Sequence, residues 1–240
     1  MEIDKAQCSA CIEMLFCDQT ETLAERVRLA HQAGFAAVEF WLWSDKDLDA
    51  IAAALRETGM GVAGFVAEPM VSLNDPANHD AFLAALPASI ATAQRLGAPF
   101  LYIQGGSALP GVPRATQTAA LTDLLRRAAE VLQGSGVILL LEPVSDARDG
   151  FLTRAAEGLP IIAAVNRPEI RLLYDLFHAT VAGEPLASTV GRNTHLIGHV
   201  HVADHPGRGA PGTGTQDLAA DLKWLRAQGY RGRFGMEHYP

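Results

Sequence analysis

The sequence has 240 residues, about half of them apolar, and its 19 basic and 27 acidic residues give a net charge of −8. This composition is sufficient for a sizeable core and too apolar for a disordered chain. The negative charge argues against nucleic-acid binding, which needs a basic patch to neutralise phosphates. No apolar stretch reaches the roughly 20 residues that a membrane span requires. Three cysteines without a signal peptide are typical of a reducing cytoplasm, where we expect the protein to act.

Short apolar runs alternate with helical patterns from one end of the chain to the other. A first helix is predicted from Thr20 to Gly34 and a second from Ser44 to Gly59, each with apolar residues at the spacing of one helical face. Further helices are predicted at residues 77–96, 115–133, 151–165, 183–190 and 215–229. Eight apolar runs are predicted strands, at residues 8–16, 36–41, 62–68, 100–106, 137–144, 170–176, 197–203 and 233–238.

This strict alternation predicts a parallel sheet with right-handed crossovers, and eight units predict closure into an α/β fold of the (β/α)8 TIM barrel type. An open, doubly wound sheet is the alternative. It is disfavoured because no G-x-G-x-x-G motif follows the first strand. Residues 1–240 are therefore predicted to form a single domain. The sequence ends directly after the eighth predicted strand, so the final helix of the barrel is expected to be missing or short.

Four consecutive predicted strands each have a potential metal ligand near the C-terminal end: Glu142, Asp175, His201 and Glu237. In a parallel barrel these ends converge on one mouth, where the active site lies. Three carboxylates and one imidazole form a hard, mostly oxygen site for a divalent cation, with Mg²⁺ or Mn²⁺ as the expected ion. The Gly- and Pro-rich loop 204–216 follows the seventh strand at the same mouth and is a candidate functional loop.

Structural roles compete with functional ones at several of these positions. Glu142 ends a strongly apolar run, so its carboxylate must be paired, and an arginine could do this as well as a metal ion. His199 and His201 share one face of their strand, and the deeper His199 is expected to be a hydrogen-bonded core residue. His238 points to the opposite side from Glu237 and is not expected to be a ligand.

A divalent ion beside two opposed carboxylates suits proton transfer next to a carbonyl group. Glu142 and Glu237 are the two glutamates among the four residues, so they are the candidate acid–base pair. Hydrolysis by a single metal ion is a rival use of such a site. Phosphodiester cleavage is disfavoured, because the sequence shows neither a basic groove nor additional metal ligands.

Seven segments, spread over nearly the whole chain, carry a more specific pattern. They are Ile12–Phe16, Gly34–Phe40, Leu139–Pro143, Tyr174–His178, Gly198–Arg208, Pro211–Gly214 and Glu237–Pro240. On these segments the chain resembles the hydroxypyruvate isomerase family, within the xylose isomerase-like barrels. The resemblance implies aldose–ketose isomerisation of a small hydroxy-oxo acid, of the type that converts hydroxypyruvate to tartronate semialdehyde.

The resemblance also implies a role for each of six residues. Glu142 and Glu237 match the proton donor and acceptor, Asp175 and His201 complete the metal shell, and His178 and Arg208 match residues that hold the substrate.

Two other functions stay open. A ketose 3-epimerase or a related oxo-sugar-acid isomerase would use the same enediolate chemistry, and a histidine at the position of His201 is more typical of such enzymes, where many hydroxypyruvate isomerases carry glutamine. A barrel that binds a sugar acid without turnover is the alternative from another class, but it has no need for two opposed carboxylates. The expected partner is a small hydroxy-oxo acid or sugar, and a homo-oligomer is possible.

Overall fold

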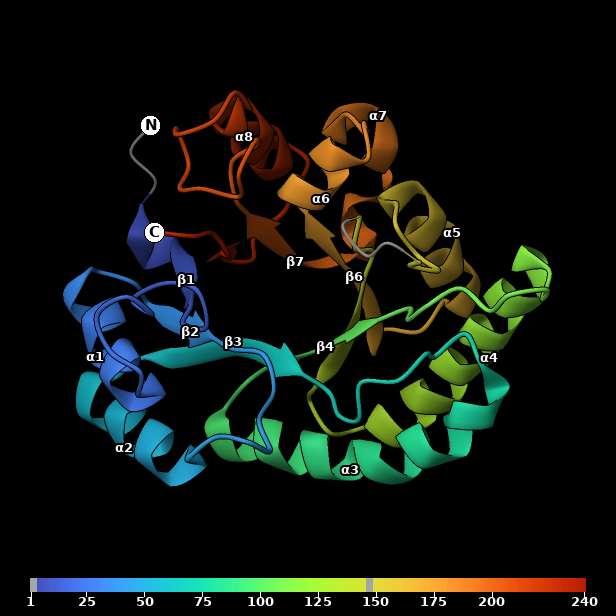
Figure 1. Cartoon of the computed structure of the whole chain (residues 1–240), viewed down its shortest axis with the longest axis horizontal. Coiled ribbons are helices and arrows are strands. Elements are labelled where there is room, and N and C mark those ends of the chain that lie inside the picture. Colours follow the sequence, from blue (N-terminus) through green and yellow to red (C-terminus); the bar gives the residue numbers. More distant parts are fainter. Residues whose placement is uncertain (1–3, 146–148) are drawn as a thin grey trace.

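The computed structural model describes residues 4–145 and 149–240, and their strands form one closed parallel barrel in the order β1 to β8 (Figure 1). Each strand pairs with the next, and β8 pairs with β1 to close the barrel. This confirms the predicted TIM barrel. The strands are β1 (Cys8–Cys11), β2 (Ala37–Glu39), β3 (Gly61–Val66), β4 (Phe100–Gln104), β5 (Ile138–Glu142), β6 (Ile170–Asp175), β7 (Ile197–Val202) and β8 (Phe234–Met236).

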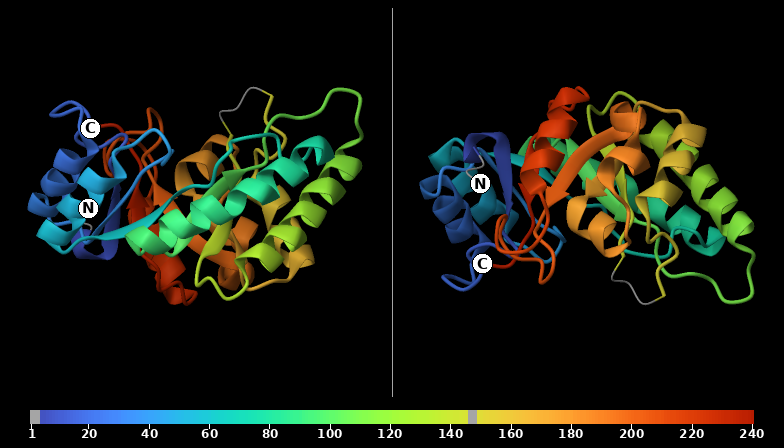
Figure 2. Two further views of the ribbon diagram at one scale, coloured as in Figure 1. Left: turned by 90° about the horizontal axis from the view of Figure 1, so that it is seen from below. Right: turned by 90° about the horizontal axis from the view of Figure 1, so that it is seen from above.

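The helices follow one another around the outside of the barrel, and the long helices α3 and α4 lie side by side (Figures 1 and 2). Among the described residues, no helix combines the length and apolar character needed to cross a bilayer. The α-helices are α1 (Leu23–Gln32), α2 (Leu48–Thr58), α3 (His79–Leu96), α4 (Arg114–Leu132), α5 (Ala155–Val165), α6 (Leu176–Val181), α7 (Leu186–Val190) and α8 (Leu218–Ala227). Short 3-10 helices occur at Lys5–Gln7, Pro76–Asn78 and Asn193–Leu196.

The strands are buried on both faces, as expected of a parallel sheet covered by helices. Leu139, Leu140 and Leu141 are all fully buried, because successive side chains of β5 point alternately to the helices and to the barrel interior. Within the described part of the chain, no helix follows β8, and α8 precedes it.

β1 is shorter than the predicted strand 8–16, and a buried arginine accounts for the difference. The Arg26 guanidinium donates hydrogen bonds to the carbonyl oxygens of Ile12 and Thr20, both at 2.8 Å. The chain therefore turns back toward α1 after Cys11 instead of continuing along the barrel.

Several helices begin later than predicted, and aspartate caps mark the start of two of them. The carboxylates of Asp47 and Asp217 cap α2 and α8, where they accept hydrogen bonds from the N–H groups of Ala50 and Ala220 at 2.9 and 3.1 Å. A carboxylate is favoured there because it also meets the positive end of the helix dipole. The helices predicted to begin at Thr20, Ser44 and Thr215 begin instead at Leu23, Leu48 and Leu218.

One buried side chain organises the loop between β7 and α8. The Asp204 carboxylate is fully buried and accepts hydrogen bonds from the N–H groups of His205, Gly212 and Gln216, at 2.9, 2.8 and 3.2 Å. Burial raises the pKa of Asp204, but backbone N–H groups, first those of Gly214 and Gly212, lower it more, so the pKa lies below its ordinary value. The loop is thus fixed by one ionised side chain.

We predict that Asp204→Ala lowers the free energy of unfolding by about 3 kcal/mol or more, because hydrogen bonds to a charged acceptor contribute roughly 1.5–3 kcal/mol each. Urea unfolding followed by circular dichroism measures this. Asp217→Ala is the matched control, since it removes an exposed helix cap at a cost of about 1 kcal/mol. An Asp204→Ala deficit no larger than that of the control would contradict the role given to Asp204.

The same deficit should depend on pH. The pKa of Asp204 is lower in the folded chain than its ordinary value of 3.8, so its stabilisation is present above pH 3.8 and is lost as the pH falls through the folded pKa. The difference between wild type and Asp204→Ala should therefore stay constant on lowering the pH from 7 to about 5 and shrink below 3.8.

Candidate active site

The four predicted ligands meet at the C-terminal mouth of the barrel. Glu142 and Asp175 are the last residues of β5 and β6, His201 lies beside Asp175 in the β6–β7 register, and Glu237 directly follows β8. Each offers one donor atom such that all four atoms lie within 4.8 Å of one another, and all four residues are buried. The convergence of strand ends therefore produces the cluster that the sequence predicts.

His201 lies at the centre of this cluster. Its Nδ1 atom is 2.9 Å from Glu237 Oε2 and 3.5 Å from Glu142 Oε1. Even so, Nδ1 has no hydrogen-bond partner among residues 4–145 and 149–240. Burial lowers the pKa of His201, but the carboxylates of Glu237 and Glu39 raise it more, to well above the usual value. The position thus favours a bound cation, whether a proton or a metal ion.

Asp175 divides its two carboxylate oxygens between the fold and the cluster. Oδ1 accepts hydrogen bonds from the N–H groups of Phe177 and His178, at 2.6 and 3.1 Å, and so caps α6, a helix not predicted separately. Oδ2 faces the cluster, 3.2 Å from the Arg208 guanidinium and 3.7 Å from His178 Nε2. The cap therefore fixes the direction in which the second oxygen points.

Arg208 and His178 lie against the carboxylates, so Arg208 is not a solvated loop residue. Arg208 Nη2 is 2.6 Å from Glu237 Oε2, and Nη1 is 3.2 Å from His178 Nε2. The guanidinium also stacks 5.1 Å from the centre of the Phe177 ring. His178 Nδ1 is 3.0 Å from Ser145 Oγ, which orients the imidazole from its other side. Both residues predicted to bind substrate are therefore at the rim of the cluster.

Glu237 is held from several sides. Its Oε1 accepts a hydrogen bond from Trp41 Nε1 at 3.0 Å, and the buried Cys11 thiol lies 3.9 Å away. Burial raises the pKa of Glu237, but His201, Arg208 and the Trp41 N–H lower it more, to about 2. Glu237 is therefore an ionised carboxylate at neutral pH. Trp41 was not predicted as a site residue and comes from the segment after β2.

Glu39 is the most prominent residue that is not predicted. It ends β2, is buried, and lies 3.1 Å from His199 Nε2 and 3.3 Å from His201 Nε2. Burial raises the pKa of Glu39, but His201 and His199 lower it more, to well below its usual value. Glu39 could have been predicted in the same way as Glu142, because it is also a glutamate at the end of an apolar run. The prediction that His199 is a hydrogen-bonded core residue agrees with this contact. His238, which is not expected to be a metal ligand, has its Nδ1 atom 2.7 Å from the Tyr239 carbonyl oxygen.

The donor set fits a divalent metal ion. Three carboxylates and one imidazole are the ligand types that Mg²⁺, Mn²⁺ and Zn²⁺ accept. The buried Nδ1 atom of His201, which lacks a hydrogen bond within the described residues, provides the independent structural observation. Glu142, Asp175, His201 and Glu237 could therefore hold such an ion.

Comparisons with known proteins agree with this fold. The model of the xylose isomerase-like TIM barrel family matches residues 27–240. A Streptomyces coelicolor protein named "Putative hydroxypyruvate isomerase" is 31% identical over 91% of this chain and 86% of that protein. Hydroxypyruvate isomerase of Escherichia coli is 28% identical, with 97% and 93% covered. A 2-oxo-tetronate isomerase of Pectobacterium atrosepticum is 26% identical, with 97% and 91% covered.

Solved structures share the fold. A Brucella melitensis protein described as AP endonuclease, family 2 has a TM-score of 0.90 at 26% identity, over 97% of this chain and 93% of that chain. D-psicose 3-epimerase from Clostridium cellulolyticum, solved with D-tagatose, has a TM-score of 0.79 at 17% identity, with 92% and 80% covered. The IOLI protein, solved with a zinc atom, has a TM-score of 0.81 at 20% identity, with 97% and 88% covered.

The family model covers most of the chain, and relatives of about 30% identity span nearly all of it. The chain therefore belongs to the xylose isomerase-like TIM barrel family, where hydroxypyruvate isomerases are among its relatives.

Proposed function

We propose that this protein is a metal-dependent aldose–ketose isomerase of a small hydroxy-oxo acid, of the type that interconverts hydroxypyruvate and tartronate semialdehyde. The observation that carries the proposal is the pair Glu142 and Glu237, which approach one buried site from two different strands together with Asp175 and His201. The names of the Streptomyces coelicolor and Escherichia coli relatives support this substrate class.

Glu142, Asp175, His201 and Glu237 would hold the metal ion, and we propose Mg²⁺ or Mn²⁺ because three of the four donors are carboxylates. When bound, the ion would polarise the substrate carbonyl and stabilise negative charge as it develops on the substrate oxygens. The burial of all four residues would limit the access of water to the reacting carbons and would strengthen these interactions.

The two glutamates would move the protons. One carboxylate removes the C–H proton from the hydroxyl-bearing carbon, and the electron pair left behind forms the enediolate. The other delivers a proton to the neighbouring carbon, which had been the carbonyl carbon, while the hydroxyl proton passes between the two oxygens. Either direction needs one glutamate as base and the other as acid, which explains why two are present.

Arg208 and His178 would bind the substrate. A guanidinium grips a carboxylate through two parallel hydrogen bonds, and Arg208 already lies at the rim of the cluster, held over Phe177. His178, fixed by its contact with Ser145, would direct Nε2 toward a substrate oxygen. Together they would place the hydroxy-oxo group over the two glutamates.

Two rivals use the same barrel. A ketose 3-epimerase would use the same residues on a longer neutral sugar, and His201 is the feature that favours it. The name of the Brucella melitensis structure suggests DNA cleavage instead. The net charge of −8 opposes that function, and so does the position of Arg208 against carboxylates rather than along an open basic groove.

We predict metal-dependent exchange of one substrate C–H proton with solvent. NMR in D₂O against a panel of hydroxypyruvate, longer hydroxy-oxo acids and neutral ketoses should show deuterium incorporation next to the carbonyl group of the preferred substrate. A chelator should abolish this exchange, and Mn²⁺ or Mg²⁺ should restore it. Binding without exchange would identify a non-catalytic barrel, and exchange limited to ketoses would identify an epimerase.

Glu142→Gln and Glu237→Gln should each abolish turnover and leave the fold intact. Glutamine keeps the shape but cannot carry the proton, and general acid–base catalysis typically contributes about 10²–10⁴-fold. Steady-state kinetics with circular dichroism measures both effects. Glu57→Gln on the outer face of α2 is the matched control and should keep full activity. More than about a tenth of wild-type activity in either site variant would refute the role of that residue.

Arg208→Lys should raise KM for a hydroxy-oxo acid far more than for a neutral ketose, because lysine cannot reproduce the two-pronged contact with a carboxylate. Parallel kinetics on the two substrates tests this. An equal loss on both would mean that Arg208 mainly supports the loop and the site carboxylates, and no loss on either would favour the epimerase.

A further inference from the structure

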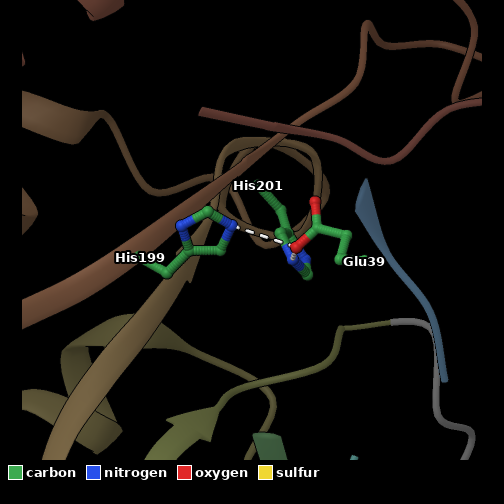
Figure 3. Close-up of side chains that lie close together, drawn as sticks. All are labelled: Glu39, His199 and His201. Carbon is green, nitrogen blue, oxygen red and sulfur yellow. Dashed lines mark hydrogen bonds and ion pairs between the residues drawn. The ribbon is translucent and has the colours of Figure 1, made fainter. Parts of the chain in front are cut away.

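A second buried cluster, formed by Glu39, His199 and His201, adjoins the proposed metal site inside the barrel. Figure 3 shows the imidazoles of His199 and His201 pointing toward the Glu39 carboxylate. Glu39 Oε2 is 3.1 Å from His199 Nε2 and 3.3 Å from His201 Nε2, and it also accepts a hydrogen bond from the Tyr102 hydroxyl at 2.7 Å. Glu39 Oε1 accepts a hydrogen bond from the Ser9 hydroxyl at 3.2 Å. Both carboxylate oxygens are therefore satisfied by donors from other strands.

Two strand glycines leave the space that this cluster occupies. A Cβ atom on Gly235 would overlap the Glu39 carboxylate and would lie 2.7 Å from His201 Cδ2 and 2.8 Å from His199 Nε2. A Cβ atom on Gly64 would lie 2.5 Å from the Tyr102 hydroxyl oxygen. Real Cβ atoms do not come this close to other atoms, so a side chain at either position would displace the cluster. The polar layer thus depends on the small residues of β3 and β8.

The two nitrogens of His201 face different groups. Nε2 faces the Glu39 carboxylate. An ionised carboxylate accepts hydrogen bonds but has no proton to donate. Nδ1 faces Glu142 and Glu237 without a hydrogen bond in the described part of the chain. A neutral imidazole carries one N–H and one lone pair, so an N–H at Nε2 puts the lone pair on Nδ1, on the side of the proposed metal site.

We propose that Glu39 is a positioning residue that holds His201 with its proton on Nε2 and its Nδ1 lone pair directed at the metal ion. This inference rests on the proposed function, because it deepens the metal site described there. Metal-binding histidines generally donate their other N–H to a carboxylate or a carbonyl, and this contact fixes the ring and increases its basicity. Glu39 lies on β2, early in the sequence, whereas the four proposed ligands lie on β5, β6 and β7 and directly after β8.

One rival assigns Glu39, His199 and His201 to a second metal site, since their donor atoms also lie within 4.8 Å of one another. The contacts of Glu39 speak against this. Its oxygens already accept hydrogen bonds from Tyr102 and Ser9. An ion bound to both Nε2 atoms would also prevent either ring from donating a hydrogen bond to the carboxylate through Nε2. The stoichiometry of metal binding separates the two arrangements.

The test is calorimetric titration of Mn²⁺ into the metal-stripped full-length protein. Wild type should bind one ion per chain, and Glu39→Gln should bind one ion with about 10–100-fold lower affinity. Glu184→Gln is the matched control, because Glu184 is also buried but accepts its hydrogen bonds from Ala155 and Ala156, outside the site. The control should leave the affinity unchanged.

A second readout separates positioning from a general weakening of the fold. Turnover by Glu39→Gln should be low at limiting Mn²⁺ and should return close to the wild-type kcat at saturating Mn²⁺, because Glu39 acts through the metal ligand and not on the substrate. A loss that saturating metal does not reduce would overturn the proposal.

Gly235→Ala provides an independent variant should Glu39→Gln fail to fold. It should weaken Mn²⁺ binding in the same way, since its Cβ atom would displace Glu39 and His201. Gly198→Ala on β7 is its control, because a Cβ atom there would contact Leu140 and Arg171, away from the cluster. If Glu39→Gln and Gly235→Ala fold and bind Mn²⁺ as tightly as wild type, the role of Glu39 is overturned. The role is also overturned if wild type binds two Mn²⁺ ions and Glu39→Gln binds one. A wild type that binds no ion would instead refute the proposed function.

Discussion

The repulsion among three buried carboxylates is the constraint on which the rest of this structure depends. Glu142, Asp175 and Glu237 each bring an oxygen into a volume in which all donor atoms lie within 4.8 Å. Two like charges about 4 Å apart repel by roughly 4 kcal/mol at the effective dielectric of a protein near its surface. Such a cluster persists only if positive charge is supplied within it or beside it.

Positive charge is arranged in two layers around the carboxylates. His201 lies among them and Arg208 lies at their outer rim, and the carboxylates raise the pKa of each despite burial. A divalent ion bound by the same donors would supply the same compensation. Two of the carboxylates are also tied to a partner outside the cluster: Asp175 caps α6, and Glu237 accepts a hydrogen bond from the indole N–H of Trp41. The directions of the side chains are therefore set by the scaffold.

The sequence is informative wherever proximity follows from barrel topology alone. The four proposed ligands end four successive apolar runs, and a parallel barrel brings such ends together whatever the details of strand register. Glu39 ends the second run in the same way and is not predicted, because its partners reach it across the barrel interior. Those contacts depend on the closure of β8 on β1 and on Gly235 leaving room, and no local pattern expresses either.

The hydrogen bond between Trp41 and Glu237 has a further consequence. Trp41 is 45% exposed, and its indole nitrogen Nε1 is 3.0 Å from Oε1 of Glu237. The emission of an indole responds to nearby charge and to access of water. The emission of Trp41 should therefore respond to a change in the charge around Glu237, which would make this indole an optical reporter of what enters the site.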